Sequence, residues 1–454
     1  MSKKRVGVLV FTKKIKERST RKLTFFDSFV YCGLNSLLLE LKDEYEIGYC
    51  DAAGIDNWDF VLVPIHSHHD VVNLMANLRG KEKHKSKVVV GGAGLINIRP
   101  FKHLIDVAVF GRAEGRIKSI LNYEPLPNVW YKEDDPDLKK RYEWGKVWFL
   151  LNNEFVQEES VGCRKKCAFC FYSWSHEFVS KGNSLRYTSS VRDIKHGKSG
   201  MKGYEDFFAN LDWGKAYKVA TITSLDGVTE QTRRMVFKPL SRERLRNKIL
   251  EAYQYKQEGR MWVKIFLILG YPWETEEDAQ LSELREDLKA IDKPNKEIRL
   301  ILTFLVSHFV PMPHTPLQWE GVNLLDFRKI LTEKVGRTVY MGKNIEAWVY
   351  PYITTPVSAI EELFLNRAFE NDADLVYKIL MNPKYKTLKA WQKKDVLLKY
   401  LPSFAYSKLD IGTPLPTDYI ETIYNIEKPA RKIRMQYENI IEKNEKKGGK
   451  YGAR

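Results

Sequence analysis

The stretch VGCRKKCAFCFYSW, from Val161 to Trp174, decides how this chain is interpreted. It places Cys163, Cys167 and Cys170 in the spacing C-x3-C-x2-C, and these are three of only five cysteines in 454 residues. A tetrahedral zinc site needs a fourth ligand, and the nearest candidate, His176, lies six residues beyond the last thiol. The three thiols therefore predict a metal centre with one coordination position left open by this loop.

The residues around the thiols favour an iron–sulfur cluster. Such clusters are held by cysteine thiolates, and an iron without a protein ligand can bind another molecule. The cations Arg164–Lys166 lie between the first two thiols, where they favour thiolates and an anionic cluster. Gly162 and the pair Ala168–Phe169 let the loop wrap closely around a metal. A zinc site or a purely structural set of thiols is the alternative.

Length and composition limit the class of protein. A chain of 454 residues with 44% hydrophobic residues predicts about three domains with sizeable cores. The longest apolar runs, such as Trp262–Tyr271, are too short for a bilayer, which needs about 20 residues, so we expect no membrane partner. The N-terminus turns apolar only briefly, which predicts a first β-strand and not a signal peptide. An odd number of cysteines, three of them clustered, predicts a reducing, cytoplasmic location.

The chain is strongly basic. Its formal net charge is +16, and residues 428–454 contain nine Lys or Arg against three Glu. A surplus of this kind favours polyanionic partners such as nucleic acid, because bound phosphates release counterions. The alternative is a generally basic soluble protein whose end is simply solvated.

Residues 1–135 alternate between predicted strands and helices, which indicates a doubly wound parallel sheet of the α/β class. Such sheets bind ligands at the carboxyl ends of their strands. The glycines of two turns, GGAG with Gly91 and Gly92 and FGRAEG with Gly111, follow predicted strands and allow close approach of a ligand. The loop His66–Asp70 (HSHHD) follows another strand, either as a metal site or as a polar loop.

The rest of the chain divides into two further predicted domains. Residues 130–148 are charged and irregular, as expected of a linker. Strands and helices alternate again from 146 to 324, and residues 325–454 are mainly helical by pattern, with a basic tail.

Several stretches, in this order, resemble the radical S-adenosylmethionine (radical SAM) enzymes that carry an N-terminal domain of the cobalamin-binding type. The thiol loop EESVGCRKKCAFCFYSW is similar to the cluster loop of that family. The stretches from Ser224 to Leu245, Leu267 to Asp278 and Phe309 to Gly321 are similar to its later motifs. The resemblance implies a Rossmann-like domain (1–135), a partial (β/α)6 barrel holding a 4Fe–4S cluster (146–324) and a helical C-terminal domain (325–454).

The resemblance also implies roles for individual residues. Cys163, Cys167 and Cys170 would hold the cluster, and its fourth iron would bind the amino and carboxylate groups of S-adenosylmethionine (SAM). His314 is a candidate for the substrate site. The remaining candidate cofactor contacts are Phe169, Asp226, Gly227, Ile268, Gly270 and Pro272 toward SAM, and Gly91, Gly92 and Gly111 in the N-terminal domain.

Two departures from the family pattern stand out. The D-x-H-x-x-G signature, which supplies a histidine to cobalt, is absent, and this leaves cobalamin binding open. The usual two glycines and an acid after the first barrel helix are also missing, since GYEDFF (Gly203–Phe208) is a poor match.

The chemistry implied by the resemblance begins with an electron from a reductant such as flavodoxin or ferredoxin. Cleavage of SAM then gives a 5′-deoxyadenosyl radical, which takes hydrogen from a substrate carbon. The net charge makes a nucleic acid base, in DNA or RNA, the first substrate hypothesis. The alternatives are a cobalamin-dependent methyltransferase or rearrangement enzyme for a small metabolite, and a nucleic-acid-binding protein with a structural metal. Methylthiolation is disfavoured because only Cys32 and Cys50 remain, both in apolar, core-like patterns.

Overall fold

The computed structural model describes most of the chain, with gaps. The described residues are 3–11, 32–144, 146–153, 156–181, 188–193, 204–205, 208–214, 221–254, 259–292, 298–350, 355–421 and 423–445. The end of the predicted basic tail, 446–454, and residues 12–31 of the predicted N-terminal domain lie outside them.

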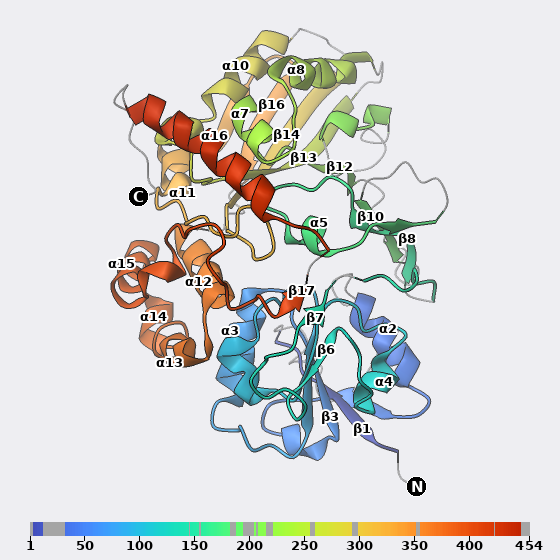
Figure 1. Ribbon diagram of the computed structural model, residues 1–454. Helices are drawn as coiled ribbons and strands as arrows, with labels where there is room; N and C mark the ends of the chain where they lie inside the picture. The colour runs from blue at the N-terminus through green and yellow to red at the C-terminus, as the bar shows by residue number, and fades with distance from the viewer. Residues whose placement is uncertain are drawn as a thin grey trace.

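The N-terminal domain is a six-stranded sheet in the order β2-β1-β3-β4-β5-β6 (Figure 1). The first five strands are parallel, and β6 pairs antiparallel with β5. The strands are β1 (Arg5–Val8), β2 (Glu46–Tyr49), β3 (Phe60–Pro64), β4 (Lys87–Gly91), β5 (Val107–Val109) and β6 (Val129–Tyr131). This order is a doubly wound one, so the predicted Rossmann-like fold is confirmed.

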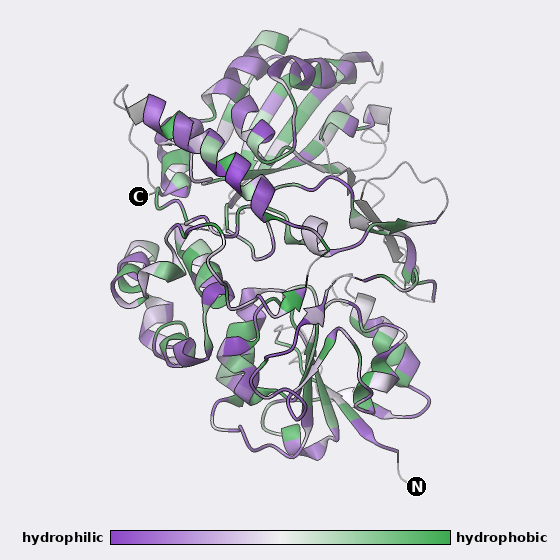
Figure 2. Ribbon diagram, viewed as in Figure 1, coloured by the Kyte–Doolittle hydropathy of each residue, from purple (hydrophilic) through white to green (hydrophobic). Residues whose placement is uncertain are grey.

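Valine-rich runs form this sheet because both of its faces are covered. On one side the sheet packs against α2 (Cys32–Leu41) and α4 (Ile117–Leu121), and on the other against α3 (His68–Leu78) and the short helix η3 (Arg99–Leu104). Figure 2 shows that these strands are mainly hydrophobic, whereas the helices around them carry both hydrophobic and hydrophilic residues. Strand β6 falls at the start of the predicted linker, whose later part forms β7 (Tyr142–Glu143).

The central domain contains a second six-stranded sheet, in the order β11-β12-β13-β14-β16-β15. Its strands are parallel except β15, which pairs antiparallel with β16. They are β11 (Tyr204–Glu205), β12 (Thr221–Ser224), β13 (Gly259–Leu269), β14 (Ile298–His308), β15 (Thr338–Met341) and β16 (Ile345–Tyr350). This open, mostly parallel sheet is the part of the chain predicted to form a partial barrel.

Helices cover one face of the central sheet. They are α7 (Glu230–Met235), α8 (Arg242–Leu250), α9 (Glu276–Ala279) and α10 (Ser282–Ile291). Along β13, Val263, Ile265 and Leu267 are buried in the same core cluster as residues of α8 and α10. The residues between them face the other side, because successive side chains of a strand alternate.

The C-terminal region differs from its predicted boundary. Residues 325–350, expected to begin the helical domain, supply β15 and β16 to the central sheet together with α11 (Phe327–Ile330). Helices follow only from residue 356: α12 (Pro356–Arg367), α13 (Ala373–Lys378), α14 (Pro383–Thr387), α15 (Ala390–Tyr400) and α16 (Glu427–Glu445). The first four pack beside the N-terminal domain, and α16 runs back across the central domain (Figure 1). In the part of the chain that is described, none of the helices has the length and apolar character to cross a membrane.

Arg367, at the end of α12, connects these segments. Its side chain is almost fully buried, and its two terminal nitrogens donate to four backbone carbonyls at 2.7–2.9 Å. These carbonyls belong to Gln318, Glu320, Phe404 and Ser407. Burial lowers the pKa of Arg367 to about 10, so the guanidinium stays charged at neutral pH.

Replacing this arginine tests its structural role. Arg367→Leu would leave the four carbonyls buried without their donor, and we expect the free energy of unfolding to fall by roughly 3 kcal/mol or more. Urea unfolding followed by circular dichroism measures this change. The exposed Arg328→Leu on α11 is the matched control and should change stability by less than about 0.5 kcal/mol. Equal effects of the two substitutions would contradict the assigned role.

Candidate functional site

The three thiols follow a strand that ends at the first of them. Strand β8 (Val156–Cys163) pairs with β9 (Val179–Ser180) and β10 (Thr188–Asp193) in a small antiparallel sheet of its own. Gly162 precedes the first thiol with φ of 84°, and a Cβ there would stand 2.1 Å from the carbonyl oxygen of Glu177. Only glycine fits this backbone, so the turn into the thiol loop requires it.

Hydrogen bonds fix the thiol loop in place. Trp174, on α5 (Phe171–Ser175), donates from Nε1 to the carbonyl of Cys167 at 2.8 Å. Ser173 donates from Oγ to the carbonyl of Cys170 at 2.9 Å. The amide of Ala168 donates to the carbonyl of Val236 at 3.1 Å. This last bond joins the loop to the segment that follows α7, beside the carboxyl end of the central sheet.

The thiols lie in a buried, mutually interacting group. Cys163 and Cys167 are buried, and Cys170 is partly buried. Burial raises the pKa of the Cys167 thiol well above its usual value, Lys238 opposes this, and negative charge on Cys170, Asp226 and Cys163 adds to it. Across the described ranges, no set of three or more His, Cys, Asp or Glu side chains stands ready to hold a metal ion, the three thiols included.

The donor set nevertheless fits an iron–sulfur cluster. Three thiols on one anchored loop interact electrostatically, and thiolates are the ligands that such clusters take. Cluster binding would require the loss of the thiol protons, because the thiolate is the ligand. The thiol positions predicted from the sequence therefore remain predicted ligands.

Asp226 and Lys238 form a buried ion pair beside the thiol loop. The Lys238 ammonium donates to a carboxylate oxygen of Asp226 and to Oγ of Ser224, and both charged side chains are less than a tenth exposed. Asp226 follows β12 with φ of 51°, and its carbonyl accepts from the hydroxyl of Tyr271 at 3.0 Å. The predicted SAM contact at Asp226 is thus brought to the carboxyl end of the central sheet, where Lys238 neutralises it.

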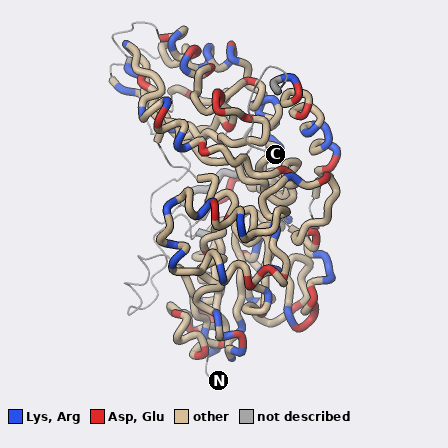
Figure 3. Tube along the Cα trace, turned by 90° about the vertical axis from the view of Figure 1, so that its left-hand side faces the viewer, with Lys and Arg blue, Asp and Glu red and all other residues tan. Residues whose placement is uncertain are grey.

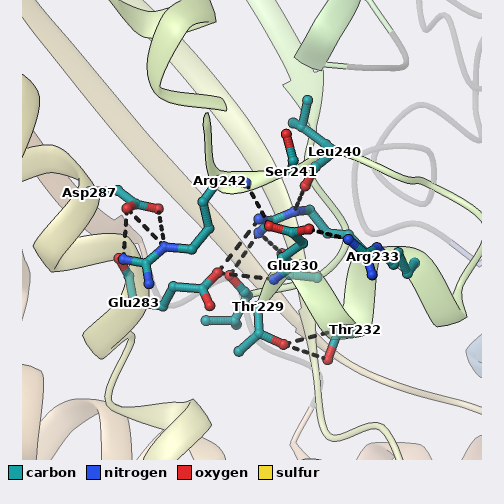
Figure 4. A network of polar contacts seen from close by, with 12 residues as sticks. Thr229, Glu230, Thr232, Arg233, Leu240, Ser241, Arg242, Glu283 and Asp287 are labelled. Atoms are coloured by element: carbon teal, nitrogen blue, oxygen red, sulfur yellow. Dashed lines mark hydrogen bonds and ion pairs between the residues drawn. The ribbon is translucent and has the colours of Figure 1, made fainter. Parts of the chain in front are cut away.

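A polar network supports the turn at Gly227 (Figure 4). The buried Arg233 donates from Nη1 to the carbonyls of Gly227 and Val228, at 3.2 and 2.8 Å, and from Nε to that of Leu240 at 2.8 Å. Glu283 accepts from the amide of Glu230 at 3.0 Å, which ties α7 to α10. A Cβ at Gly227 would approach Thr232 Cγ2 to 2.9 Å, so this glycine serves close packing.

The loop after β13 is equally constrained. Gly270 has φ of 90°, and a Cβ there would lie 2.5 Å from the ring of His308. The amides of Gly270 and Tyr271 donate to one oxygen of Glu274 at 2.7 and 3.2 Å. Pro272, in the same loop, is buried. Glu274 is the residue that sequence reasoning missed here, although it falls within the stretch from Leu267 to Asp278 that resembles a family motif.

An apolar cluster joins the two loops to the last helix. Phe169 and Ile268, both predicted contacts of SAM, pack against a core that includes Tyr271 and Trp273. Phe169 and Tyr271 have ring centroids 6.2 Å apart. Residues of α16, among them Ile433 and Tyr437, belong to the same cluster. The predicted SAM contacts therefore lie together beneath a helix that the sequence pattern did not connect with them.

A buried carboxylate holds α16 over this cluster. Glu320 is 2% exposed and accepts from Arg434 Nε and Nη2 at 3.0 and 2.8 Å. It also accepts from the hydroxyl of Tyr437, whose ring lies 5.4 Å from that of Trp273. A charged pair buried in this way stabilises one position of the helix, because removal of either partner would leave the other unpaired.

The predicted glycines of the N-terminal domain line a separate cavity. Gly91, Gly92 and Gly111 border a space of about 300 Å³ at the carboxyl ends of β3, β4 and β5. Gly92 has φ of 119°, and a Cβ there would lie 2.5 Å from a backbone oxygen of Ile65. The cavity has the size of a small-ligand pocket and stands where a doubly wound sheet binds ligands.

Two side chains close this cavity from the side of the thiol loop. Trp144 is 2% exposed, its ring lies 5.0 Å from that of Phe171, and its buried Nε1 has no hydrogen-bond partner among the described residues. His176 follows α5, and its Nδ1 lies 3.0 Å from Ser175 Oγ. Burial lowers the pKa of His176 to about 4, so its imidazole is neutral at neutral pH. A ligand with an acceptor atom would satisfy the indole of Trp144.

The other histidines singled out in the sequence lie in the loop His66–Asp70 and at His314. In the loop His66–Asp70, Asp70 accepts from the amides of His66 and Ser67 at 2.9 and 3.1 Å and so caps α3. His314 is 6% exposed, with φ of 58° and its ring 6.1 Å from Phe171. Its Nε2 has no hydrogen-bond partner in the described part of the chain. The proposed substrate role of His314 stays a prediction.

The fold and site define an α/β protein in which a Rossmann-like domain and a mostly parallel central sheet flank a three-thiol loop. A scan of protein-family models found no match, and neither did a search of curated proteins.

This chain is similar to solved structures of radical SAM enzymes, with low sequence identities and low TM-scores. TsrM from Kitasatospora setae, a radical S-adenosylmethionine methyltransferase with tryptophan substrate and a SAM analogue bound, is 12% identical with a TM-score of 0.41, over 70% of this chain and 75% of that one. OxsB, a cobalamin-dependent S-adenosylmethionine radical enzyme with aqua-cobalamin, is 11% identical with a TM-score of 0.33, over 73% of this chain and 56% of that one. With SAM also bound, OxsB is 12% identical with a TM-score of 0.32, over 88% of this chain and 71% of that one.

The buried Glu274 makes stability depend on pH. Burial raises its pKa from 4.5 to about 8, so its contribution to stability is fully present below about pH 4.5 and is lost as the pH rises through 8. Glu274→Gln keeps a neutral acceptor at all pH values. We expect the variant to gain thermal stability relative to the wild type between about pH 5 and pH 9, by on the order of a few kcal/mol.

Thermal unfolding at both pH values measures this difference. The exposed neighbour Glu276→Gln on α9 is the control and should follow the wild type. A Glu274→Gln variant whose stability falls with pH as steeply as that of the wild type would show that this carboxyl does not titrate there.

Proposed function

We propose that this protein is a radical SAM enzyme that cleaves S-adenosylmethionine reductively and modifies a carbon atom of its substrate. The observation that carries this proposal is the loop with Cys163, Cys167 and Cys170, held against the carboxyl end of the central sheet by the bond from Ala168 to Val236. The motif resemblance described above agrees with this arrangement, since it assigns the thiols and the loops at Asp226 and Gly270 to one site.

The chain's own residues would bind and orient SAM. When bound by the three thiols, a 4Fe–4S cluster supplies the electron that breaks the sulfur–carbon bond of SAM. Phe169 and Ile268, which are partly exposed and pack on the buried Tyr271, offer an apolar surface for the adenine, next to the ion pair of Asp226 and Lys238. Helix α16 covers this surface and excludes water, which protects a reactive radical from side reactions.

The cavity of the N-terminal domain supports cobalamin as a second cofactor. It can hold part of such a molecule, and the unpartnered indole nitrogen of Trp144 and the neutral imidazole of His176 are available to polar groups of a ligand there. Cobalamin bound between this cavity and the thiol loop would favour methyl transfer or rearrangement as the outcome.

The structure favours a small-molecule substrate over the nucleic acid base of the first hypothesis. The basic residues of α16 are partly neutralised, because Arg434 pairs with Glu320 and Arg431 with Glu427. Positive and negative residues are interspersed on the face shown in Figure 3. A nucleic acid substrate remains the second candidate, on the observation that the net charge is +16.

Alanine substitution of one thiol tests the first part of the proposal. After anaerobic reconstitution with iron and sulfide, we expect Cys167→Ala to lose most of the bound iron and to form no 5′-deoxyadenosine from SAM under reductant. The reason is that two thiolates cannot replace the three that hold the cluster. Cys50→Ala is the control, since Cys50 is a buried core residue away from the loop. Unchanged iron content and nucleoside release in Cys167→Ala would refute the proposal.

The cobalamin site has its own test. Trp144→Phe keeps the ring but removes the Nε1 donor, so we expect the affinity for hydroxocobalamin to fall about fivefold, as for the loss of one hydrogen bond. Equilibrium dialysis with visible spectra measures the affinity. Trp148→Phe, whose indole contacts the Arg116 guanidinium at 3.9 Å, is the control. If the wild type retains no cobalamin, the second cofactor is excluded while the SAM chemistry stands.

A further inference from the structure

A lysine-rich segment lies in the C-terminal helices, beside the N-terminal domain (Figure 1). Residues 378–400, from the end of α13 through α14 and α15, contain seven lysines and one aspartate, and we call this segment the lysine lobe. It carries a net charge of +6, out of +16 for the whole chain, in one short stretch. Its cations are Lys378, Lys384, Lys386, Lys389, Lys393, Lys394 and Lys399.

The charge of the lysine lobe is not neutralised by carboxylates. Among the described residues, none of its seven lysines forms an ion pair with an acidic side chain. Lysines elsewhere do pair, as Lys87 does with Glu133 and Lys408 with Glu438. The lobe therefore presents a positive field to solvent, and such a field attracts a polyanion.

Two aromatic rings stand exposed among these lysines. Trp391, near the start of α15, is 63% exposed, and Tyr400, at the end of the same helix, is 55% exposed. The Lys399 ammonium lies 5.2 Å from the centroid of the Tyr400 ring. The apolar side of α15 is not part of this surface, because Leu397 is buried in the core. The lobe thus offers rings and cations together.

Trp391 also borders a groove of about 590 Å³ between α15 and residues 326–333. Small-ligand pockets span about 300–1,000 Å³, so the groove has room for a base with its sugar. Asp395 lies one helical turn beyond Trp391 on the exposed side of α15, and its carboxylate can accept from the amino group of a base. The other charged residues of the groove are Asp326, Arg328, Lys329, Glu333 and Lys394.

The composition of this surface selects one kind of polyanion. Interfaces with acidic proteins are depleted in lysine, whereas lysine is a common partner of phosphate groups. Binding to an anionic membrane needs an apolar helix face as well as cations, and the apolar sides of these helices are buried in the core. Single-stranded nucleic acid uses both features of the lobe, since its phosphates bind cations and its unpaired bases stack on aromatic rings.

We infer that the lysine lobe binds single-stranded nucleic acid, with phosphates on the lysines and one base stacked on Trp391 in the groove. The residues of this surface are not those of the candidate SAM site, whose apolar cluster comes from the thiol loop, the loop after β13 and α16. The inference goes beyond the proposed function, because binding of the strand requires neither the cluster nor SAM. A strand held on the lobe is anchored there and does not have to be the molecule that is modified.

Binding without turnover tests the inference. The reconstituted protein, without reductant, is titrated into a fluorescein-labelled single-stranded DNA of about 20 nucleotides, and anisotropy gives the affinity. We expect this strand to bind more tightly than a duplex of the same sequence or polyglutamate of the same length, because neither of these offers unstacked bases. The affinity is measured at several salt concentrations between about 50 and 200 mM, which gives the slope of log K against log salt.

Charge reversal locates the phosphate contacts. Lys384, Lys386 and Lys389 are exposed, and we combine Lys384→Glu, Lys386→Glu and Lys389→Glu in one variant. We expect its affinity for the strand to fall about tenfold or more at low salt, and its salt slope to become shallower by about two, since each phosphate contact of a single strand contributes about 0.7 to the slope.

A second triple variant is the matched control for this charge reversal. Lys42→Glu, Lys83→Glu and Lys85→Glu change three exposed lysines of the N-terminal domain and remove the same net charge. Its salt slope should equal that of the wild type, and its affinity should stay within about twofold, because screening limits the effect of distant charges.

Trp391→Leu tests the stacking contact separately. We expect the affinity for the single strand to fall about fivefold or more, as for the loss of stacking by one base. The salt slope should not change, because no phosphate contact is removed. Thermal midpoints close to that of the wild type show that the variants are folded, as expected for substitutions at exposed positions.

Several results would overturn the inference. Polyglutamate that binds as tightly as the single strand would show a surface for acidic proteins instead. Equal losses in the two triple variants would show an effect of net charge without a site on the lobe. A single strand that does not bind at low salt, or that binds Trp391→Leu as tightly as the wild type, would also contradict it. Missing iron or missing 5′-deoxyadenosine in the wild type bears on the proposed function alone, since the strand is measured without turnover.

Discussion

The hydrogen bond from the amide of Ala168 to the carbonyl of Val236 joins two parts of the chain that belong to different sheets. Strand β8 is not paired with the central sheet within the described residues, so the thiol loop has no strand ladder to hold it there. Its position depends on this bond, on the contacts of Trp174 and Ser173, and on the glycine backbone at Gly162. The candidate site is thus held together by hydrogen bonds between loops, and each of these loops adjoins a helix or a strand.

Buried ionisable side chains lie at the junctions between the segments of the molecule. Arg367 joins α12 to two loops, Glu274 holds the turn after β13, and Glu320 holds α16. A buried charge costs free energy unless it is fully bonded, and each of these groups receives or makes several hydrogen bonds. An alternative packing of the segments would be less stable, because it would leave one of these buried groups without its hydrogen-bond partners.

Much of the architecture could be predicted from the sequence. Continuous valine runs such as those of β3 and β4 form strands buried on both faces, and their alternation with helices is a strong signal. The three thiols and the loops at Asp226 and Gly270, which the sequence analysis assigned to one site, lie near one another in the structure, and their roles stay predictions. Glycines and cysteines at fixed spacings carry such signals because they reflect local backbone and ligand requirements.

Other features had no local signal. The segment after β13 is divided into two helices, α9 and α10, because the buried Leu281 between them adopts φ of 55°, which leucine rarely adopts. Lys238 resembles any surface lysine in the sequence, and only the fold brings it to Asp226. The contribution of residues 338–350 to the central sheet likewise depends on pairing with a distant strand, β14. Interactions of this kind are set by tertiary packing, which a single sequence does not reveal.

The cover over the thiol site comes from α16, which follows every other described element along the chain. A growing polypeptide therefore completes both sheets and the thiol loop before this helix emerges from the ribosome. During that interval Tyr271 and Trp273, which share an apolar cluster with Ile433 and Tyr437 of α16, lack this part of their cover. Packing of α16 then completes the apolar core beside the thiol loop.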